Sequence, residues 1–376
     1  MELSKEELLR YSRHIAIPEF NVEGQKKLKG GKVLVIGSGG LGSPVLLYLA
    51  AAGVGTIGIV DFDVVDDSNL QRQVLFTVHD IGKSKAETAK ERLLALNPYL
   101  NIIVHNTRFT TENALDLVKD YDVVADGTDN FPTRYLVNDA CVLAGKVNVY
   151  ASIFRFEGQV SVFNFPNPDG SRGPNYRDLF PTPPPPGLVP NCSEGGVLGV
   201  LPGIIGSLQA CEVIKVLSGV GDPLAGRLFL FDAASFTTRI LKVNKDPAVE
   251  IKGLINYEQF CGIGGGTEEN PLKEITPQEL QQLIESNTDF QLIDVREPYE
   301  FEIANLQGEL YPLSSVSSHA GKIARDKMVV VHCKGGVRSA KAIRELEDNF
   351  GFDNLYNLKG GILAFSKEVD SAIPTY

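Results

Sequence analysis

The chain has 376 residues, which suits two domains because a single hydrophobic core stops growing near about 250–300 residues. With 43% hydrophobic and 22% charged residues, its composition is that of an ordinary soluble globular protein. The formal net charge of −11 argues against a surface that coats nucleic acid, although a local nucleotide site is compatible with it.

The N-terminal part of the chain predicts a cytoplasmic α/β protein. Charged residues occur within its first few positions, so the segment lacks the apolar core of a signal peptide. Residues 33–60 are uncharged over a length that could span a bilayer, but glycines and Pro44 divide them into strand, turn, helix and strand, so we expect no membrane contact. The expected strands at 32–37 and 56–63, with a helix at 42–53 between them, make a right-handed βαβ unit.

Further alternation of helices and strands follows. The expected elements are a helix at 84–97, strands at 101–109 and 121–130, a helix at 206–219 and a strand at 227–233. They predict a Rossmann-like α/β domain with a mainly parallel sheet. Between residues 164 and 196, proline and glycine are too frequent for a core element, so this stretch should be a long surface loop with polyproline II at 183–186.

A second, smaller α/β domain is expected near the C-terminus. The segment Cys261–Asn270 is rich in glycine and then charged, which is typical of a linker. Thr276 is the expected N-cap of a helix at 276–286. Beyond it we expect strands at 290–295 and 328–332 and a helix at 339–350. The predicted organisation is a first domain over residues 1–261, a flexible linker over 262–270 and a second domain over 271–376.

The motif Gly37-Ser-Gly39-Gly40-Leu-Gly42 follows a strand and opens a helix, which is the setting of a nucleotide-binding loop. Its glycines allow a tight turn and close backbone approach, so that amide groups and the helix dipole can meet phosphates. Asp61, at the end of the next strand, suits hydrogen bonds to ribose hydroxyls. By itself this fingerprint also fits a nicotinamide dehydrogenase.

Side chains beyond the second strand favour phosphoryl chemistry over hydride transfer. They are amide and cationic donors: Asn69, Arg72, Gln73 and Lys85. Such donors stabilise a phosphoryl group under attack, whereas hydride transfer has no need of them. Asp126 and Asp129 follow at the carboxyl end of another strand, where α/β ligands bind, and a carboxylate there could hold Mg²⁺.

Residues 1–254 resemble the MoeB/ThiF family of ubiquitin-activating-like adenylyltransferases. The resemblance rests on the motifs RYSRHI, VLVIGSGGLGSP, VDFDVVDDSNLQRQ, GKSKAETAKERLLALNP, DGTDNFPTRYLVNDAC and GVLPGIIGSLQACEVIK. It implies a homodimer that binds ATP and Mg²⁺. It also implies that the partner is a small ubiquitin-like sulfur carrier of the MoaD/ThiS type, whose C-terminal Gly-Gly carboxylate is adenylated with release of pyrophosphate.

The same resemblance implies roles for individual residues. Gly39 and Gly40, within the loop from Gly37 to Gly42, would face the phosphates, and Asp61 would face the ribose. The remaining nucleotide contacts would come from Asn69, Arg72, Gln73, Lys85 and Asn130. Asp129 would bind Mg²⁺, and Arg13 would reach into the partner subunit's site like an arginine finger.

The chain departs from the family where many members bind a structural zinc ion with two CxxC pairs. The corresponding positions hold Asn175, Asp178, Val249 and Lys252. Valine cannot ligate zinc and lysine is a poor ligand at neutral pH, so we expect no zinc site. Packing should hold these segments instead.

The five cysteines form no CxxC pair, as expected for reduced cytoplasmic thiols. In family members fused to a sulfurtransferase, a cysteine at the position of Cys192 is proposed to attack the acyl-adenylate; the alternative is a spectator thiol. Cys141 and Cys211 stand in apolar helical patterns and are expected in the core.

Cys333 ends an apolar strand and is followed by a glycine-containing loop and a helix. Amide groups of such a loop form an anion-binding nest, and the helix N-terminus adds positive potential, so both favour a thiolate. Lys334 and Arg338 favour a bound anion such as a persulfide or thiosulfate. Phosphatases use a similar cradle, but they have five residues between Cys and Arg, whereas this loop has four.

The segments LIDVREPYEFEIANL and NLKGGILAF flank the loop in the order seen in rhodanese domains, so residues 271–376 resemble a single-domain rhodanese. Asp294 and Arg296 are expected to support the cradle. The two domains together resemble the adenylyltransferase–sulfurtransferase fusions of molybdenum-cofactor, thiamine or thiolated-tRNA synthesis. That resemblance implies adenylation of the carrier and then sulfur transfer from a Cys333 persulfide. The alternative is an activating enzyme for a ubiquitin-like protein modifier with a non-catalytic rhodanese docking domain.

Overall fold

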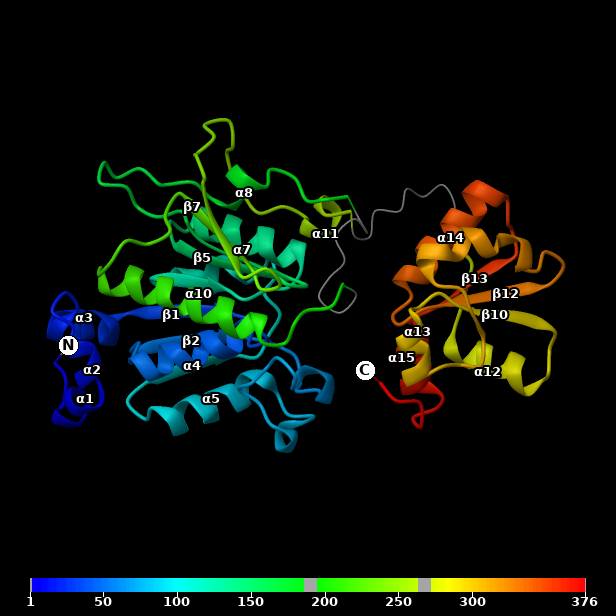
Figure 1. The fold of residues 1–376 in the computed structure, drawn as a ribbon, viewed down its shortest axis with the longest axis horizontal. Helices are drawn as coiled ribbons and strands as arrows, with labels where there is room; N and C mark the ends of the chain where they lie inside the picture. Colours follow the sequence, from blue (N-terminus) through cyan, green and yellow to red (C-terminus); the bar gives the residue numbers. More distant parts are fainter. Residues whose placement is uncertain (1, 186–194, 263–271, 376) are drawn as a thin grey trace. The chain divides into compact units, whose positions relative to one another are not determined.

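The computed structural model describes residues 2–185, 195–262 and 272–375 (Figure 1). The chain divides into two compact units, Met1–Gly265 and Gly266–Tyr376, and each has its own hydrophobic core. Cys192 lies outside the described residues, as do Pro186 and residues 263–270 of the expected linker.

The first unit is built on an eight-stranded sheet in the order β3-β2-β1-β4-β5-β6-β7-β8. Its strands are β1 (Lys32–Ile36), β2 (Thr56–Val60), β3 (Asn101–His105), β4 (Val123–Asp126), β5 (Val147–Phe154), β6 (Glu157–Phe163), β7 (Arg227–Asp232) and β8 (Thr237–Lys242). Pairing is parallel from β3 through β5 and antiparallel from β5 through β8. Strands β1, β2, β3, β4 and β7 follow the sequence prediction, whereas β5, β6 and β8 were not predicted.

Helices cover both faces of this sheet (Figure 1). The helices of the described part of this unit are α1 (Lys5–Arg10), α2 (Ser12–Ile15), α3 (Asn21–Gly30), α4 (Gly42–Ala52), α5 (Lys85–Leu96), α6 (Ala114–Lys119), α7 (Phe131–Leu143), α8 (Tyr176–Leu179), α10 (Leu201–Ser218) and α11 (Tyr257–Phe260). Alternate residues of β1 enter two different cores. Val33 and Val35 pack with α4, α5 and α10, whereas Leu34 and Ile36 pack with α6 and α7. A strand buried on both faces needs apolar residues throughout, which is why β1 shows no alternation.

Local signals explain where individual helices begin and end. The Ser84 side chain accepts a hydrogen bond from the Glu87 amide and caps α5. Helix α4 ends at Gly53, whose left-handed conformation (φ 83°) is open to glycine without strain. Within the stretch expected to be irregular, the Asn175 side chain caps the short helix α8, which the sequence analysis did not predict.

The order of the strands places a topological switch point between β1 and β4. The chain runs outward from β1 to β2 and β3, and then returns to the other side of β1 with β4. In α/β proteins the loops on the two sides of such a switch point diverge, and the crevice expected between them, at the carboxyl ends of the strands, is where ligands bind. In this chain the loops that follow β1 and β4 touch, since a Cβ on Gly127 would lie 3.3 Å from the Gly37 carbonyl oxygen.

Among the described residues, α10 is the one helix long and apolar enough to cross a membrane by length and composition. Half of that window is buried inside the protein. Residues Ala210 and Val213 of α10 belong to the core that also contains α4 and α5. We therefore assign α10 to the interior packing of the first unit.

The second unit contains a five-stranded parallel sheet in the order β11-β10-β12-β13-β9. Its strands are β9 (Glu274–Ile275), β10 (Phe290–Asp294), β11 (Glu309–Leu310), β12 (Met328–His332) and β13 (Leu355–Leu358). Its helices are α12 (Pro277–Glu285), α13 (Pro298–Ile303), the 3-10 segment η3 (Leu313–Lys322), α14 (Val337–Phe350) and α15 (Gly361–Glu368). The expected Thr276 cap is present, with a reciprocal hydrogen bond from its backbone to Glu279. Again β12 is buried on both faces, with Val329 and Val331 in one core and Val330 in the other.

Candidate functional site

The glycine loop after β1 is shaped by contacts that exclude side chains. A Cβ on Gly42 would lie 2.0 Å from the Gly37 carbonyl oxygen, and one on Gly40 would lie 3.3 Å from the Pro202 side chain. Gly37 has a φ of 88°, a conformation that favours glycine. The loop leads directly into α4, so its amides and the helix N-terminus face the crevice, as phosphate binding requires.

Asp61 holds the glycine loop from the end of β2. Its Oδ2 atom accepts hydrogen bonds from the Ser38 amide at 2.8 Å and the Ser38 hydroxyl at 2.7 Å. Its Oδ1 atom accepts the Asp63 amide at 2.9 Å. The sequence analysis assigned Asp61 to the ribose and missed this second role. The signal was the serine between the first two glycines, which can donate twice to one carboxylate oxygen.

Arg72 and Gln73 lie against the glycine loop. Gln73 Nε2 is 3.6 Å from where a Cβ of Gly39 would stand, and Arg72 Cγ is equally far from that of Gly40. Gln73 is buried, and its Oε1 atom has no hydrogen-bond partner among the residues that the structure describes. A buried amide oxygen without a partner is rare in proteins and indicates a missing donor such as a ligand group.

Asn69 and Lys85 organise the segment that carries Arg72 and Gln73. Asn69 ends a 3-10 turn, and its carbonyl oxygen accepts the amides of both residues, at 3.0 and 2.9 Å. Lys85 is the first residue of α5 and is buried. Its ammonium group forms an ion pair with Asp63 at 3.4 Å, so the structure ties its charge to the loop after β2.

The two aspartates after β4 occupy different environments. Asp126 is fully buried, and burial raises the pKa of its carboxyl group. Its Oδ1 atom accepts the Thr128 amide and hydroxyl, whereas Oδ2 has no hydrogen-bond partner within the described part of the chain. Asp129 is exposed at the mouth of the crevice. The Asn130 side chain accepts the Thr133 amide and caps α7, so part of its capacity as an acceptor is already used.

Arg13 lies far from the glycine loop of its own chain. It is exposed on α2, and its neighbour Tyr11 packs against Gly53 at the C-terminus of α4. The glycine loop stands at the opposite end of this 11-residue helix, about 16 Å away at 1.5 Å per residue. The structure therefore does not bring Arg13 together with the other candidate nucleotide residues.

The cysteines fall into different environments. Cys141 is buried in the core of α7, and burial raises the pKa of its thiol well above the usual range. Cys211 is exposed on α10, so the expectation that it belongs to the core is wrong. An apolar pattern predicts which residues share one face of a helix, but it does not predict which face is covered by a neighbouring element. Cys192 lies outside the described residues, so its proposed role has no structural account.

Cys333 lies directly after β12 with its sulfur enclosed by the loop. The residue is 1% exposed, and Sγ accepts the Gly336 amide at 3.1 Å. The Ser339 hydroxyl lies 3.3 Å from Sγ and 2.6 Å from Asn357 Oδ1. The sequence analysis did not single out Ser339 or Asn357, because Asn357 lies on another strand. The sulfur thus accepts one backbone amide and lies beside a hydroxyl whose single proton can also go to the Asn357 side chain or the Gly336 carbonyl, and both groups are neutral dipoles of the kind that stabilise a sulfur anion.

The start of α15 closes the cradle from below. The Ile362 amide donates to the Cys333 carbonyl oxygen at 2.9 Å, and the Leu363 amide donates to that of Lys334 at 3.2 Å. A Cβ on Gly361 would lie only 2.4 Å from the Cys333 carbonyl oxygen, and its φ of 61° also favours glycine. The glycine pair in NLKGGILAF is therefore required for the approach of this backbone to the loop.

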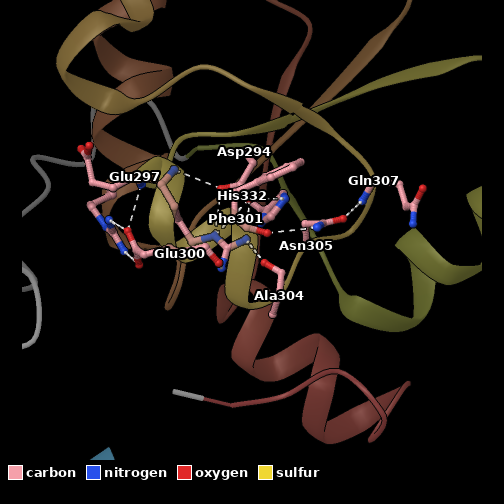
Figure 2. A network of polar contacts seen from close by, with 10 residues as sticks. Asp294, Glu297, Glu300, Phe301, Ala304, Asn305, Gln307 and His332 are labelled. Carbon is pink, nitrogen blue, oxygen red and sulfur yellow. Dashed lines mark hydrogen bonds and ion pairs between the residues drawn. The ribbon is translucent and has the colours of Figure 1, made fainter.

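Asp294 and Arg296 form a fully buried ion pair. Figure 2 shows Asp294 beside His332 of the cradle strand. Arg296 also donates to the backbone carbonyls of Glu300 and Ala304. His332, which precedes Cys333, is fully buried, and its Nε2 atom is 3.7 Å from Asp294 Oδ2. Burial lowers the pKa of His332 to about 4, so the imidazole is neutral at physiological pH. These contacts fit the expected supporting role of Asp294 and Arg296.

Arg338, expected to bind an anion, is already paired with a carboxylate. Its two terminal nitrogens donate to both oxygens of Glu300, at 2.6 and 2.7 Å. Glu300 comes from α13, 38 residues earlier in the chain, and its side chain is 3% exposed. The sequence analysis did not identify Glu300, because nothing local predicts that α13 packs beside the start of α14.

Comparison with known protein families identifies both units. The ThiF family matches residues 11–251, and the rhodanese-like domain matches residues 276–368. The chain belongs to the ThiF family. It carries a rhodanese-like domain after the ThiF region, in the order that the sequence resemblance implied.

Relatives of this ThiF-family chain carry names that describe their activities. It is 51% identical over 380 residues to a probable adenylyltransferase/sulfurtransferase MoeZ of Mycobacterium tuberculosis, covering 100% of this chain and 96% of that protein. The adenylyltransferase and sulfurtransferase MOCS3 of Drosophila grimshawi is 41% identical over 396 residues, covering 100% of this chain and 87% of that protein. A sulfur carrier protein adenylyltransferase of Thermus thermophilus is 52% identical over 270 residues, covering 70% of this chain and 100% of that protein.

The chain is accordingly an enzyme, an adenylyltransferase and a sulfurtransferase. This finding does not support the dehydrogenase alternative that the glycine loop alone left open. Among solved structures, Escherichia coli MccB aligns with a TM-score of 0.59 and 24% identity over 67% of this chain and 74% of that one. The microcin C7 biosynthetic enzyme MccB in complex with N-formylated MccA aligns with a TM-score of 0.57 and 25% identity, over 65% and 75% of the two chains.

The ThiF region uses hydrogen bonds where the resemblance led us to look for zinc ligands. Asn175 and Asp178 form the reciprocal cap of α8, and Asp178 Oδ1 also accepts the Asp246 amide at 2.9 Å. Val249 has no ligating atom, and Lys252 forms an exposed ion pair with Glu250. Throughout the described part of the chain, no group of three or more His, Cys, Asp or Glu side chains could hold a metal ion.

A buried ionic network anchors the same segment to the core. Asp139 of α7 accepts two hydrogen bonds from Arg177 of α8, at 2.8 and 2.7 Å, and one from the Tyr257 hydroxyl at 2.8 Å. Asp139 is 1% exposed. The network joins α7, α8 and α11, and so connects the proline-rich region with the end of the ThiF region.

Proposed function

We propose that this enzyme adenylates the C-terminal Gly-Gly carboxylate of a small ubiquitin-like sulfur carrier and then converts it to a thiocarboxylate with sulfur from a Cys333 persulfide. The observation that carries the proposal is the cradle of Cys333, whose buried Sγ accepts the Gly336 amide at 3.1 Å in a chain that also builds a nucleotide crevice. A relative named sulfur carrier protein adenylyltransferase, which matches 70% of this chain, supports the choice of substrate.

The residues of the crevice fit ATP. The glycine loop leaves room for phosphates beside its amides, and Arg72 lies next to Gly40 to balance their charge. The unpartnered Gln73 Oε1 and the remaining lone pairs of Asp61 supply acceptors for the nucleoside. Lys85 adds a buried cation to the loop after β2.

Asp129 fits Mg²⁺, because it is an exposed carboxylate at the mouth of the crevice, and Mg²⁺ is usually bound by one or two carboxylates together with phosphate oxygens. When bound, the metal would neutralise charge on the phosphates. Asp126 is unsuited to this role because it is fully buried and already accepts two hydrogen bonds from Thr128.

The first half of the reaction makes the carrier reactive. Its carboxylate attacks the α-phosphorus of ATP, the bond to pyrophosphate breaks, and an acyl-adenylate forms. Cys192 is our candidate for the thiolate that next displaces AMP to give a thioester. The tail of the carrier is then held as an acyl group with a thiolate as leaving group.

The second half delivers sulfur. The Cys333 persulfide anion attacks the thioester carbonyl, forms an acyl disulfide and releases the Cys192 thiolate. That thiolate attacks the sulfur atom of Cys333, which frees the thiocarboxylate and leaves a Cys192–Cys333 disulfide. A cytoplasmic thiol reduces this disulfide and restores both cysteines. Cys333 is regenerated by an external persulfide or thiosulfate donor.

We further propose that the enzyme acts as a cytoplasmic homodimer with a shared nucleotide site. The position of Arg13 supports this, since it is exposed at the end of α4 opposite the glycine loop, about 16 Å away. An arginine there can serve the site of a second copy and not its own. Mixing Arg13→Ala protomers with Asp129→Ala protomers should restore part of the ATP–pyrophosphate exchange that each variant lacks alone.

The decisive experiment is the intact mass of a Gly-Gly-ended carrier after incubation with the enzyme, Mg·ATP and a sulfur donor. We expect a gain that matches replacement of one oxygen by sulfur, and its loss in Cys333→Ala. Cys211→Ala, at an exposed cysteine outside the cradle, is the matched control and should retain the gain. Unchanged sulfur transfer in Cys333→Ala would refute the persulfide step. A stable thioester without sulfur transfer would support the protein-modifier alternative instead.

A further inference from the structure

The rim of the sulfur cradle contains an arginine whose charge is cancelled within the domain. Arg338 is the second residue of α14, next to Ser339, whose hydroxyl lies 3.3 Å from Cys333 Sγ. Both of its terminal nitrogens are engaged by the two oxygens of Glu300, at 2.6 and 2.7 Å. Bidentate arginine–carboxylate pairs are among the strongest polar contacts in proteins, so the guanidinium is committed to Glu300.

Glu300 is fixed in place by contacts from its own helix and from its neighbours. Its Oε2 atom accepts the Glu297 amide at 3.0 Å, which closes the capping box of α13. Its backbone carbonyl accepts Arg296 Nη1 at 3.4 Å, and Arg296 is in turn held by Asp294 and Ala304 (Figure 2). With a side chain only 3% exposed, Glu300 is held against Arg338 by the fold.

The described contacts of the sulfur itself are neutral. Sγ accepts the Gly336 amide and lies beside the Ser339 hydroxyl. Dipoles of this kind suffice for a thiolate or a persulfide, each of which carries at most one negative charge. Thiosulfate carries two negative charges and leaves as sulfite with two, so its transfer depends on the net positive charge at the cradle. Lys334 contributes to that charge, whereas the pairing with Glu300 removes the contribution of Arg338. The fixed carboxylate of Glu300 also opposes the approach of a dianion.

We propose that Glu300 is a specificity-determining residue, which neutralises Arg338 and so makes the cradle select an organic persulfide over a dianionic inorganic donor such as thiosulfate. This inference rests on the proposed function, because it takes Cys333 as the acceptor of sulfane sulfur. It narrows the class of donor to a low-molecular-weight or protein-bound persulfide.

Transfer of sulfur from an organic persulfide to Cys333 conserves atoms and electrons. The Cys333 thiolate attacks the terminal sulfur of R–S–SH, the sulfur–sulfur bond of the donor breaks, and R–S⁻ leaves with the electron pair. Cys333 then carries S–SH, which loses its proton to solvent to give the persulfide anion. Cys333 is oxidised to the level of a persulfide and the donor is reduced to a thiol, so no other redox partner is needed.

The test compares two donors, thiosulfate and glutathione persulfide, by the kcat/KM of Cys333 persulfide formation in the full-length protein. In Glu300→Gln, which keeps the shape of the side chain, we expect the thiosulfate-to-persulfide ratio to rise about tenfold, equivalent to about 1.4 kcal/mol. In Glu300→Gln/Arg338→Gln, which removes both charges, the ratio should return toward that of the unmodified protein. Glu302→Gln, an exposed residue of the same helix, is the matched control.

Each outcome has one meaning. A ratio that does not change in Glu300→Gln overturns the inference, provided that the variant retains its thermal midpoint and its ATP–pyrophosphate exchange. A double variant that keeps the high ratio also overturns it, because the gain would then not come from Arg338. If neither donor loads Cys333 in the unmodified protein, the proposed function fails before the question of selectivity arises. Retention of the low ratio in Glu300→Asp, which preserves the charge, would support the inference.

Discussion

Replacing Asp61 by asparagine tests whether this residue shapes the glycine loop or only meets the nucleotide. The carboxylate accepts three hydrogen bonds, two from Ser38 and one from the Asp63 amide. Asparagine has one acceptor oxygen and one donor group of the same shape. If the asparagine oxygen faces Ser38, its NH2 group faces the backbone N–H of Asp63. In the reverse orientation, the NH2 group faces the backbone N–H of Ser38.

The expected loss follows from that count. One of the three hydrogen bonds becomes a contact between two donors, and hydrogen bonds to charged groups are worth about 1.5–3 kcal/mol each. The other two lose their charge assistance, which roughly halves their strength. Because Asp61 is buried, solvent cannot replace the lost partner. We therefore expect Asp61→Asn to destabilise the ThiF region by about 3 kcal/mol and to weaken ATP binding at least about tenfold.

Hydrogen exchange of the segment 33–46 and ATP titration calorimetry measure the two effects separately. In Asp61→Asn, the amides of this segment should exchange faster even without ATP, because the loop loses its anchor. Asp67→Asn, on the exposed turn after β2, should change neither quantity. Weaker ATP binding with unchanged exchange and an unchanged thermal midpoint would refute the anchoring role and leave only a contact with the nucleotide.

Three further predictions concern stability and the sulfur cradle. Asp139→Ala should lower the free energy of unfolding of the ThiF region by about 3 kcal/mol, since it leaves the partly buried Arg177 and the buried Tyr257 without this partner. Urea unfolding measures this loss, and a value under about 1 kcal/mol would contradict the prediction. Burial lowers the pKa of His332 to about 4 in the fold, from about 6.5 for an ordinary histidine, so the unfolded chain binds the proton first as the pH falls. The rhodanese-like domain should therefore be most stable above pH 6.5 and lose on the order of 3 kcal/mol as the pH falls toward 4, and His332→Leu should flatten this slope in calorimetric scans. Gly361→Ala, whose Cβ would meet the Cys333 carbonyl at 2.4 Å, should abolish persulfide loading and preserve ATP–pyrophosphate exchange. Gly335→Ala, which places its Cβ in open space in the cradle loop after Cys333, should load normally.

Much of the nucleotide site follows from the sequence, because its parts lie at the ends of predictable strands. The glycine loop, Asp61 and Asp129 each stand directly after an apolar run, and the carboxyl ends of parallel strands meet at one edge of a sheet. The positions of these residues at strand ends predict that their side chains lie near one another, but they do not predict which hydrogen bonds the side chains form. They do not reveal that Asp61 is shared with Ser38, or that Asn130 is used as a helix cap.

The errors in the fold have different causes, and β5, whose first five residues are buried, carries an apolar signal that was missed. Strand β8 is exposed along its whole length and β6 has a mixed pattern, so neither gives the apolar signal that identifies a buried strand. Helix α8 has only four residues and depends on the Asn175 cap within a proline-rich stretch. The exposure of Cys211 depends on which face of α10 is covered by other elements, and the sequence pattern does not show this.

By itself, the sequence determined the two α/β units, the glycine loop, and a thiol at the end of a buried strand, because these depend on periodicity and on backbone conformations that few residues allow. Tertiary structure alone decided which charges meet. Arg338 and Glu300 are 38 residues apart and pair because α13 packs beside α14. Ser339 reaches both Cys333 and Asn357 because β12 and β13 are neighbours. Side-chain partners separated along the chain are set by packing, and packing is a property of the whole fold.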